Sequence, residues 1–270
     1  MIDVDMNVKP SPFSGDIAWE IQYANISRYW QGVDKLWQES DTRKRDKQIA
    51  TLLYDVIFLT GIQLVNTNIF TEALSTAKKK INKLSRSGYL LCHRLVQGNK
   101  EIPIYSVGPA AFKEDLSNRA YHHAFYKEYG TTKVLKILSV NQLFVRLMKN
   151  FYVKQDFGVL PPYTSNMQIL SKKVGNPIEN RDKIIKYHVI SIRDYNADIE
   201  DMIRQLPKIE DKAIVICSSQ KVLNEIHKTV QNMSNLRFTT DDRLFRCPLS
   251  SAFFQATEEG YEDVQVGMFE

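Results

Sequence analysis

Hydroxyl-bearing and basic side chains recur through residues 71–100 in a pattern typical of a nucleic-acid-binding surface. Residues 68–87 (NIFTEALSTAKKKINKLSRS) are predicted to form a helix, because their apolar members recur at three- and four-residue steps and share one face. The hydroxyl and basic residues fall largely on the opposite face, which suits a helix lying in a DNA groove. The candidate DNA-binding residues are Thr71, Ser75, Thr76, Lys79, Lys80, Lys83, Arg86, Arg94 and Lys100.

Base edges and phosphates would be contacted by different members of this set. Ser75, Thr76 and Lys79 are the candidates for base edges. The candidates for phosphate contact are Lys80, Lys83, Arg94 and Lys100.

Charge supports this prediction through its distribution and not through its total. The chain holds 36 Lys+Arg and 31 Asp+Glu, and the net charge of +5 alone does not indicate nucleic acid as a partner. Residues 76–94, however, include basic residues and no acidic one, whereas residues 194–211 are balanced or acidic. A solvated helix face and a protein-interaction module remain the alternatives.

Three helices are expected to position the basic side chains. Residues 44–58 and 61–65 are predicted to be the first two helices, with Thr60 as the N-cap of the second. Asn68 is the expected N-cap of the third helix, and Gly88 is expected to end it in the left-handed conformation.

A hairpin is expected to follow the third helix. Residues 89–96 and 102–107 are predicted to be its strands, joined through residues 97–101. Pro103 lacks a backbone N–H and therefore indicates an edge strand, which a two-stranded wing tolerates. Three helices and a hairpin predict a winged helix-turn-helix over residues 41–110.

The segment before this domain, residues 1–40, is predicted to be a loose lead-in followed by an amphipathic helix over residues 16–39. This helix would pack on the winged domain or form a dimer surface, because aromatic stripes serve both purposes. Its stripe is formed chiefly by Tyr29, Trp30, Val33, Leu36 and Trp37.

The second half of the chain alternates strand and helix patterns after a linking helix over residues 111–130. Residues 131–150 are expected to form a helix, followed by strands at 151–160, 184–193, 213–218 and 236–240 and helices at 196–206 and 221–233. Alternation of this kind predicts an α/β domain over residues 131–247 with a mixed or partly parallel sheet. The chain as a whole is therefore expected to be an α+β multidomain protein, with residues 248–270 as a peripheral tail.

Several of these motifs together resemble the replication-relaxation family of plasmid and mobile-element proteins. The resemblance lies in FLTGIQL, KLSRSGYL and PIYSVGPAA and covers about 65 residues. The residues that carry it are Leu59, Thr60, Leu84, Gly88, Tyr89, Leu90, Tyr105, Gly108 and Pro109. It implies sequence-specific binding of duplex DNA in replication, relaxosome formation or transcriptional control, with a restriction-endonuclease-like second domain. It also suggests a replication or conjugation protein as a partner, whereas a homodimer is suggested by the aromatic stripe of residues 16–39.

Catalysis is not expected from this second domain. An active endonuclease core would need paired carboxylates to hold a metal ion, and the chain offers Ser191-Ile192-Arg193 at the central strand with only Asp156 and Asp194 nearby. His122-His123 is interpreted as a surface or interdomain pair. In Cys217-Ser218-Ser219, the last serine is expected to cap the following helix. A divergent metal-dependent nuclease remains the alternative.

No cofactor is expected either. The three cysteines lack metal-ligand spacing, and the chain has neither a P-loop nor a GxGxxG motif, so no nucleotide is predicted. The first residues do not resemble a secretory signal, and no apolar run approaches the roughly 18 residues of a membrane span. We therefore expect a cytoplasmic protein that does not bind membranes.

Overall fold

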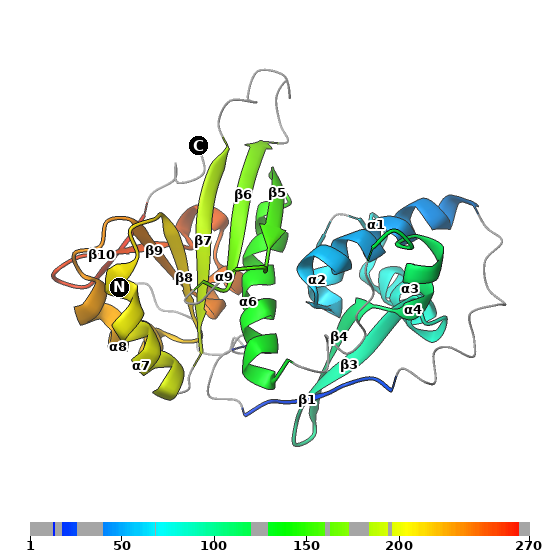
Figure 1. The fold of residues 1–270 in the computed structure, drawn as a ribbon, viewed down its shortest axis with the longest axis horizontal. Coiled ribbons are helices and arrows are strands. Elements are labelled where there is room, and N and C mark those ends of the chain that lie inside the picture. The colour runs from blue at the N-terminus through cyan, green and yellow to red at the C-terminus, as the bar shows by residue number, and fades with distance from the viewer. Residues whose placement is uncertain are drawn as a thin grey trace.

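The computed structural model describes residue 13 and residues 18–25, 40–67, 69–119, 129–159, 163–172, 184–193 and 196–264. Two sheets dominate it, with helix α6 (Thr131–Leu147) lying between them (Figure 1). The N-terminal lobe holds residues 18–119 and the C-terminal lobe residues 129–264. An α+β fold with one partly parallel sheet is thus confirmed. No helix in the described ranges is long and apolar enough to cross a membrane.

In its described residues, the N-terminal lobe contains four helices and an antiparallel sheet. Its elements are β1 (Glu20–Gln22), α1 (Ser40–Val56), β2 (Leu59–Thr60), α2 (Gly61–Val65), α3 (Leu74–Arg86), β3 (Leu90–Gln97), β4 (Lys100–Val107) and α4 (Pro109–Glu114). The strand order is β1-β3-β4-β2, so the hairpin β3–β4 forms the centre of a four-stranded sheet. The prediction of a two-stranded hairpin with β4 at its edge is therefore wrong. Pro103 is tolerated because β2 pairs only with Ile104 and Tyr105 of β4.

Residues 20–22 form a strand, and the predicted helix over residues 16–39 is wrong there. Glu20 pairs with Val96 of β3, and the backbone N–H of Ala24 donates to Nδ1 of His93 at 3.0 Å. Partners more than 60 residues away in the chain thus take the hydrogen bonds that a helix would have satisfied locally. The stripe residues Tyr29, Trp30, Val33, Leu36 and Trp37 lie outside the described residues.

Helix α3 begins at Leu74, six residues later than its predicted start at Asn68, which itself lies outside the described residues. Phe70 packs in the core from a non-helical segment. The carboxylate of Glu72 accepts a hydrogen bond from the backbone N–H of Thr71 and pairs with Lys80. This local side-chain bond holds the segment away from helical geometry. Leu74, which periodicity assigned to the buried face, is 51% exposed.

The C-terminal lobe contains a seven-stranded mixed sheet covered on both faces. Its strands are β5 (Phe151–Asp156), β6 (Ser165–Lys172), β7 (Ile185–Ile192), β8 (Ala213–Cys217), β9 (Leu236–Thr240), β10 (Phe254–Ala256) and β11 (Tyr261–Asp263). Its helices besides α6 are α7 (Asn196–Gln205), η3 (Leu206–Lys208), α8 (Gln220–Val230), α9 (Asp241–Arg246) and η4 (Leu249–Ser251). Strands β7, β8 and β9 are parallel, as the alternating pattern predicted, and the outer pairs are antiparallel.

Alternating residues of the parallel strands enter two different cores. Val189 and Ile214 face the side of the sheet covered by α6, whereas Ile190 and Val215 face α7 and α8. The tail predicted to be peripheral is instead part of this sheet through Asp263, and Phe253 and Phe254 are buried. Strands β6, β10 and β11 were not predicted from the sequence.

Helix α6 joins the two lobes through one continuous core. Buried residues of α1, α3 and β4 belong to the same apolar cluster as residues of α6, β7 and β8. The side-chain amide of Asn141 donates to the backbone oxygens of Val56, at 2.8 Å, and Phe58, at 2.6 Å. Ile57 between them has φ 67°, which is strained for a β-branched residue. The strained turn that ends α1 is thus held by a helix of the other lobe.

Candidate nucleic-acid interface

Helix α3 presents one apolar and one polar face, as the sequence predicted. Ala77, Ile81 and Leu84 are buried. At about 100° per residue, the side chains centred opposite this stripe are five exposed polar or basic residues. They are Ser75, Lys79, Asn82, Lys83 and Arg86, here called the basic face. Thr76, also exposed, lies at its border.

Two glycines fix the end of α3 against the hairpin. Gly88 has φ 70°, and the N–H of Tyr89 donates to the oxygen of Leu84 at 3.0 Å, which completes a Schellman cap. A Cβ on Gly108 would lie 2.2 Å from the oxygen of Gly88, so only glycine permits this close approach. The predicted left-handed cap at Gly88 is confirmed, and it sets the direction in which β3 leaves α3.

The helix before α3 is capped as predicted. The hydroxyl of Thr60 accepts from the N–H of Gln63 at 3.1 Å, and the side-chain oxygen of Gln63 accepts from the N–H of Thr60 at 3.0 Å. The amide nitrogen of Gln63 also donates to the oxygen of Leu138 in α6 at 2.7 Å. This capping box therefore anchors α2, and with it the turn into α3, to the central helix.

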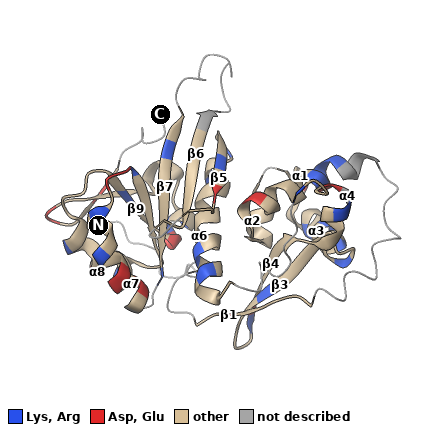
Figure 2. Cartoon of the chain, viewed as in Figure 1, with Lys and Arg blue, Asp and Glu red and all other residues tan. Residues whose placement is uncertain are grey.

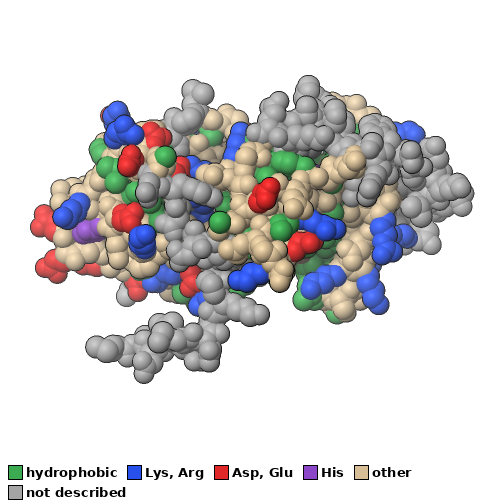
Figure 3. All heavy atoms as spheres, turned by 90° about the horizontal axis from the view of Figure 1, so that it is seen from below, with side chains coloured by type: hydrophobic (Ala, Val, Ile, Leu, Met, Phe, Trp, Pro, Cys, Tyr) green, Lys and Arg blue, Asp and Glu red, His purple; other side chains and the backbone are tan. Residues whose placement is uncertain are grey.

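The cations of the candidate set differ in their partners. Lys79, Lys83 and Arg86 on α3 and Lys100 at the hairpin are exposed and form no ion pair with any described residue. In Figure 2, basic residues mark α3 and β3. The view from below in Figure 3 likewise shows several basic groups on the N-terminal lobe, at the right. These side chains keep their positive charge available to an external anion.

Two predicted phosphate contacts are instead partly neutralised. Lys80 is half-buried and pairs with Glu72, which also pairs with Arg45 at 3.4 Å. The hydrogen bond from Lys80 holds the pKa of Glu72 below its usual range. Arg94 pairs with Glu101 across the hairpin at 3.2 Å. Thr71 is exposed but lies before α3 and not on it.

Asn82 was missed by the sequence prediction, although its spacing could have indicated it. It stands three residues after Lys79 and four before Arg86, which places all three on one helical face. An asparagine amide can both donate to and accept from an adenine edge. The basic face therefore combines cations with a hydroxyl and an amide.

Of the two carboxylates considered for a nuclease, the structure describes only Asp156. Asp156 ends β5 and accepts from the N–H of Gly158 at 2.8 Å, and Asp194, like His122-His123, lies outside the described residues. Ser191 is hydrogen-bonded to Ser139 of α6 at 2.7 Å. Within the described ranges, no cluster of three or more His, Cys, Asp or Glu side chains could hold a metal ion.

The sequence prediction missed a buried ion pair at the carboxyl ends of the parallel strands. Arg193 and Asp241 contact each other at 2.5 Å, with each side chain 1% exposed. Burial raises the pKa of Asp241 to about 6, although the guanidinium favours the charged carboxylate. Arg193 also donates to the oxygens of Phe13 and Ile216. The pair ties β7 to the start of α9 and is enclosed by protein, so it serves packing and not substrate contact.

The Cys217-Ser218-Ser219 motif beside this pair has the predicted structural role. Ser219 caps α8 by accepting from the N–H of Val222 at 3.3 Å. Burial raises the pKa of the Cys217 thiol, which disfavours the thiolate.

No protein-family description, curated protein or solved structure matches this chain, so the interface rests on its own geometry.

Proposed function

We propose that the chain binds duplex DNA through a winged helix-turn-helix formed by residues 41–110. In this proposal α2 and α3 form the helix-turn-helix, α3 enters the major groove, and the hairpin β3–β4 is the wing. The resemblance to the replication-relaxation family supports a role in the replication, relaxosome formation or transcriptional control of a plasmid or mobile element. The C-terminal lobe, which that resemblance likens to a restriction endonuclease core, would contact partners and not catalyse a reaction.

The observation that carries the proposal is the composition of the basic face. Lys79, Lys83 and Arg86 lie at spacings of four and three residues with no acidic partner among the described residues. Ser75 and Asn82 lie between them as neutral hydrogen-bonding groups. A face that merely keeps a helix soluble usually mixes charges of both signs, as α7 does with the exposed residues Glu200, Asp201 and Arg204.

The dimensions of α3 suit the groove of B-DNA. Its 13 residues extend over about 20 Å, and the major groove is about 12 Å wide. Lys100 lies at the two-residue turn of the adjacent hairpin, where Gly98 has φ 52°. A cation at that position can contact the phosphate backbone beside the groove.

Salt dependence distinguishes DNA binding from a protein-interaction role. Each phosphate neutralised by a cation lowers the slope of log K against log salt by about 0.9. We expect the triple variant Lys79→Ala, Lys83→Ala, Arg86→Ala to make that slope less negative by about 2.7. At about 0.1 M salt, the corresponding loss of affinity is roughly 500-fold. Binding is measured by fluorescence anisotropy on duplexes enriched from a random library by the native protein.

A matched triple variant provides the control. Lys149, Lys212 and Lys228 are exposed residues of the C-terminal lobe, and their replacement by alanine removes the same charge from the chain. We expect this control to bind like the native protein. The proposal fails if the native protein enriches no duplex, or if the two triple variants lose the same affinity.

A further inference from the structure

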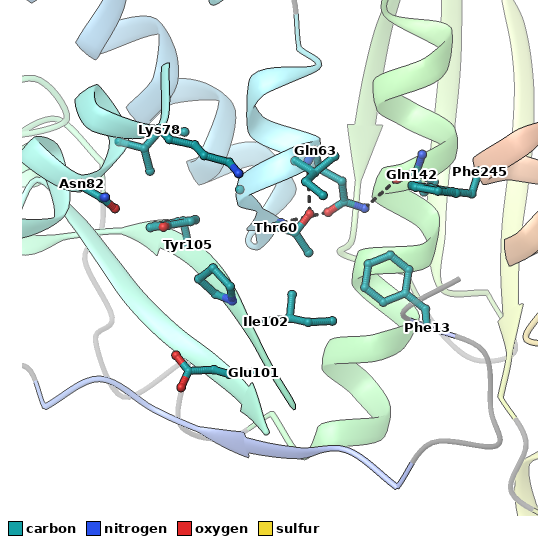
Figure 4. Close-up of a pocket in the computed structure, with 14 residues that line it drawn as sticks. Phe13, Thr60, Gln63, Lys78, Asn82, Glu101, Ile102, Tyr105, Gln142 and Phe245 are labelled. Carbon is teal, nitrogen blue, oxygen red and sulfur yellow. Dashed lines mark hydrogen bonds between the residues drawn. The ribbon is translucent and has the colours of Figure 1, made fainter. Parts of the chain in front are cut away.

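A cavity of about 450 Å³ opens between the lobes and is bordered on α3 by Lys78, Ile81 and Asn82 (Figure 4). Its walls come from α2, α3 and β4 of the N-terminal lobe and from α6 and α9 of the C-terminal lobe. Ligand sites in proteins commonly have volumes of about 300–1,000 Å³ and lie between structural units. The main apolar lining residues are Phe13, Ile62, Ile102, Pro103, Tyr105 and Phe245.

The rim of this cavity exposes large apolar side chains to solvent. Ile62 is 55% exposed and Phe245 is 46% exposed, and they are two of five large apolar residues with such exposure among those described. They come from different lobes and border the same opening. An apolar ligand seated between them would remove this surface from water.

Most polar groups of the lining already have partners. Thr60 and Gln63 form the capping box, and Gln63 donates to the side-chain oxygen of Gln142 at 3.3 Å. Glu101 is paired with Arg94. The side chain of Glu101 also lies well apart from that of Lys78 in Figure 4. These groups close the cavity and leave few hydrogen-bonding positions for a ligand.

Two donors remain. The ammonium group of Lys78 extends from α3 toward Thr60 and Gln63 in Figure 4 and forms no ion pair with a described residue. The side-chain nitrogen of Gln142 donates to no described residue, since Gln142 acts only as an acceptor for Gln63. A cation and an amide donor above aromatic and aliphatic walls are complementary to a carboxylate on a flat apolar body.

We propose that this cavity binds a small aromatic carboxylate. The ring would lie against Phe13, Ile102 and Tyr105, under the rim formed by Ile62 and Phe245. The carboxylate would accept a hydrogen bond from Lys78. The carboxylate contact does not use a cation of the basic face, because Lys78 is not part of that face, although Asn82 of the basic face also lines the cavity.

Isothermal titration with 1-naphthoate tests the proposal, with neutral naphthalene-1-methanol as the matched probe. We expect 1-naphthoate to bind at one site per chain and the alcohol to bind on the order of tenfold more weakly, because it lacks the charge that Lys78 recognises. Lys78→Gln should abolish the preference for the carboxylate. Ile62→Trp, which fills the opening from a half-exposed position, should weaken both probes.

Lys228→Gln removes one charge from α8 in the other lobe and should leave both affinities unchanged. Thermal melting confirms that each variant is folded. Absence of saturable 1-naphthoate binding would overturn the proposal. Equal affinity of the native protein for the two probes would overturn it as well, and so would a Lys78→Gln variant that retains the native preference.

Discussion

Replacement of Asn141 by leucine tests whether α6 holds the end of α1. Asn141 is fully buried, and its amide nitrogen donates to the backbone oxygens of Val56 and Phe58 on either side of Ile57. Its oxygen accepts from the amide of Gln155 at 3.1 Å. Leucine has a similar size but can form none of these bonds, and Ile57 would keep its positive φ without them.

The expected cost follows from the number of bonds lost. A buried hydrogen bond contributes about 1 kcal/mol, and a polar group left without a partner costs about 1–3 kcal/mol. The oxygen of Val56 also accepts from the N–H of Phe58 at 2.8 Å, so it keeps one hydrogen-bond partner when the bond from Asn141 is removed. We therefore expect Asn141→Leu to lower the free energy of unfolding by about 2–4 kcal/mol. In a protein of this size, that corresponds to a decrease in Tm of roughly 4–15 °C.

Differential scanning calorimetry measures this decrease, with Asn224→Leu as the control. Asn224 lies on a helix as Asn141 does, but it is exposed on α8 and only accepts from Gln220. We expect its replacement to change stability by less than about 0.5 kcal/mol. Equal Tm values for the two variants would refute the conclusion that Asn141 anchors the strained turn.

Two further predictions concern the sheet of the N-terminal lobe. Burial lowers the pKa of His93 to about 3, whereas an unfolded histidine titrates near 6.5. The unfolded state therefore binds more protons between these values, and His93 contributes stability above pH 6.5 that is lost on acidification. When the pH falls from 7.5 to 5, the free energy of unfolding measured by chemical denaturation should decrease by about 2 kcal/mol more in the native protein than in His93→Gln. Equal decreases in the two proteins would contradict this prediction. Gly108→Ala should cost at least about 2 kcal/mol, because its Cβ would meet the oxygen of Gly88. Gly130→Ala, whose Cβ meets nothing within 4 Å, is the control, and equal costs would contradict the predicted clash.

Local signals account for what could be predicted from the sequence in the N-terminal lobe. The capping box of Thr60 and Gln63 and the left-handed cap at Gly88 depend on residues within a few positions of one another. The exposure of Lys79, Lys83 and Arg86 follows from helical periodicity in the same way. These features can therefore be predicted from the local sequence.

The elements of the N-terminal lobe that were missed or wrongly predicted depend on partners far away in the sequence. Strand β1 has only three residues and depends on β3, about 75 positions later, so residues 20–22 contain no strong strand pattern of their own. The start of α3 depends on Glu72, which bonds to both Lys80 and Arg45. The same contact reduces the availability of Lys80, which periodicity alone cannot indicate.

In the C-terminal lobe, too, local patterns were predictable from the sequence and long-range contacts were not. The parallel strands β7, β8 and β9 were predicted because each is a continuous apolar run separated by helical patterns. Strands β10 and β11 are three residues long and were assigned to a tail, although Phe254 and Tyr261 pack against the core. Arg193 and Asp241 lie 48 positions apart and become partners only when β7 and β9 enter the same sheet.

The two proposed sites share helix α3 and adjoin at Asn82, but their cations lie on different sides of the helix. Lys78 and Lys79 are adjacent in sequence and therefore point about 100° apart, one into the cavity and one into the basic face. Ile81 packs between the cavity and the core and is 1% exposed, so α3 cannot shift toward a ligand without disturbing dense packing. Lys78→Gln and Lys79→Ala consequently remove different charges from one rigid helix. The carboxylate site and the DNA interface can therefore be confirmed or refuted independently.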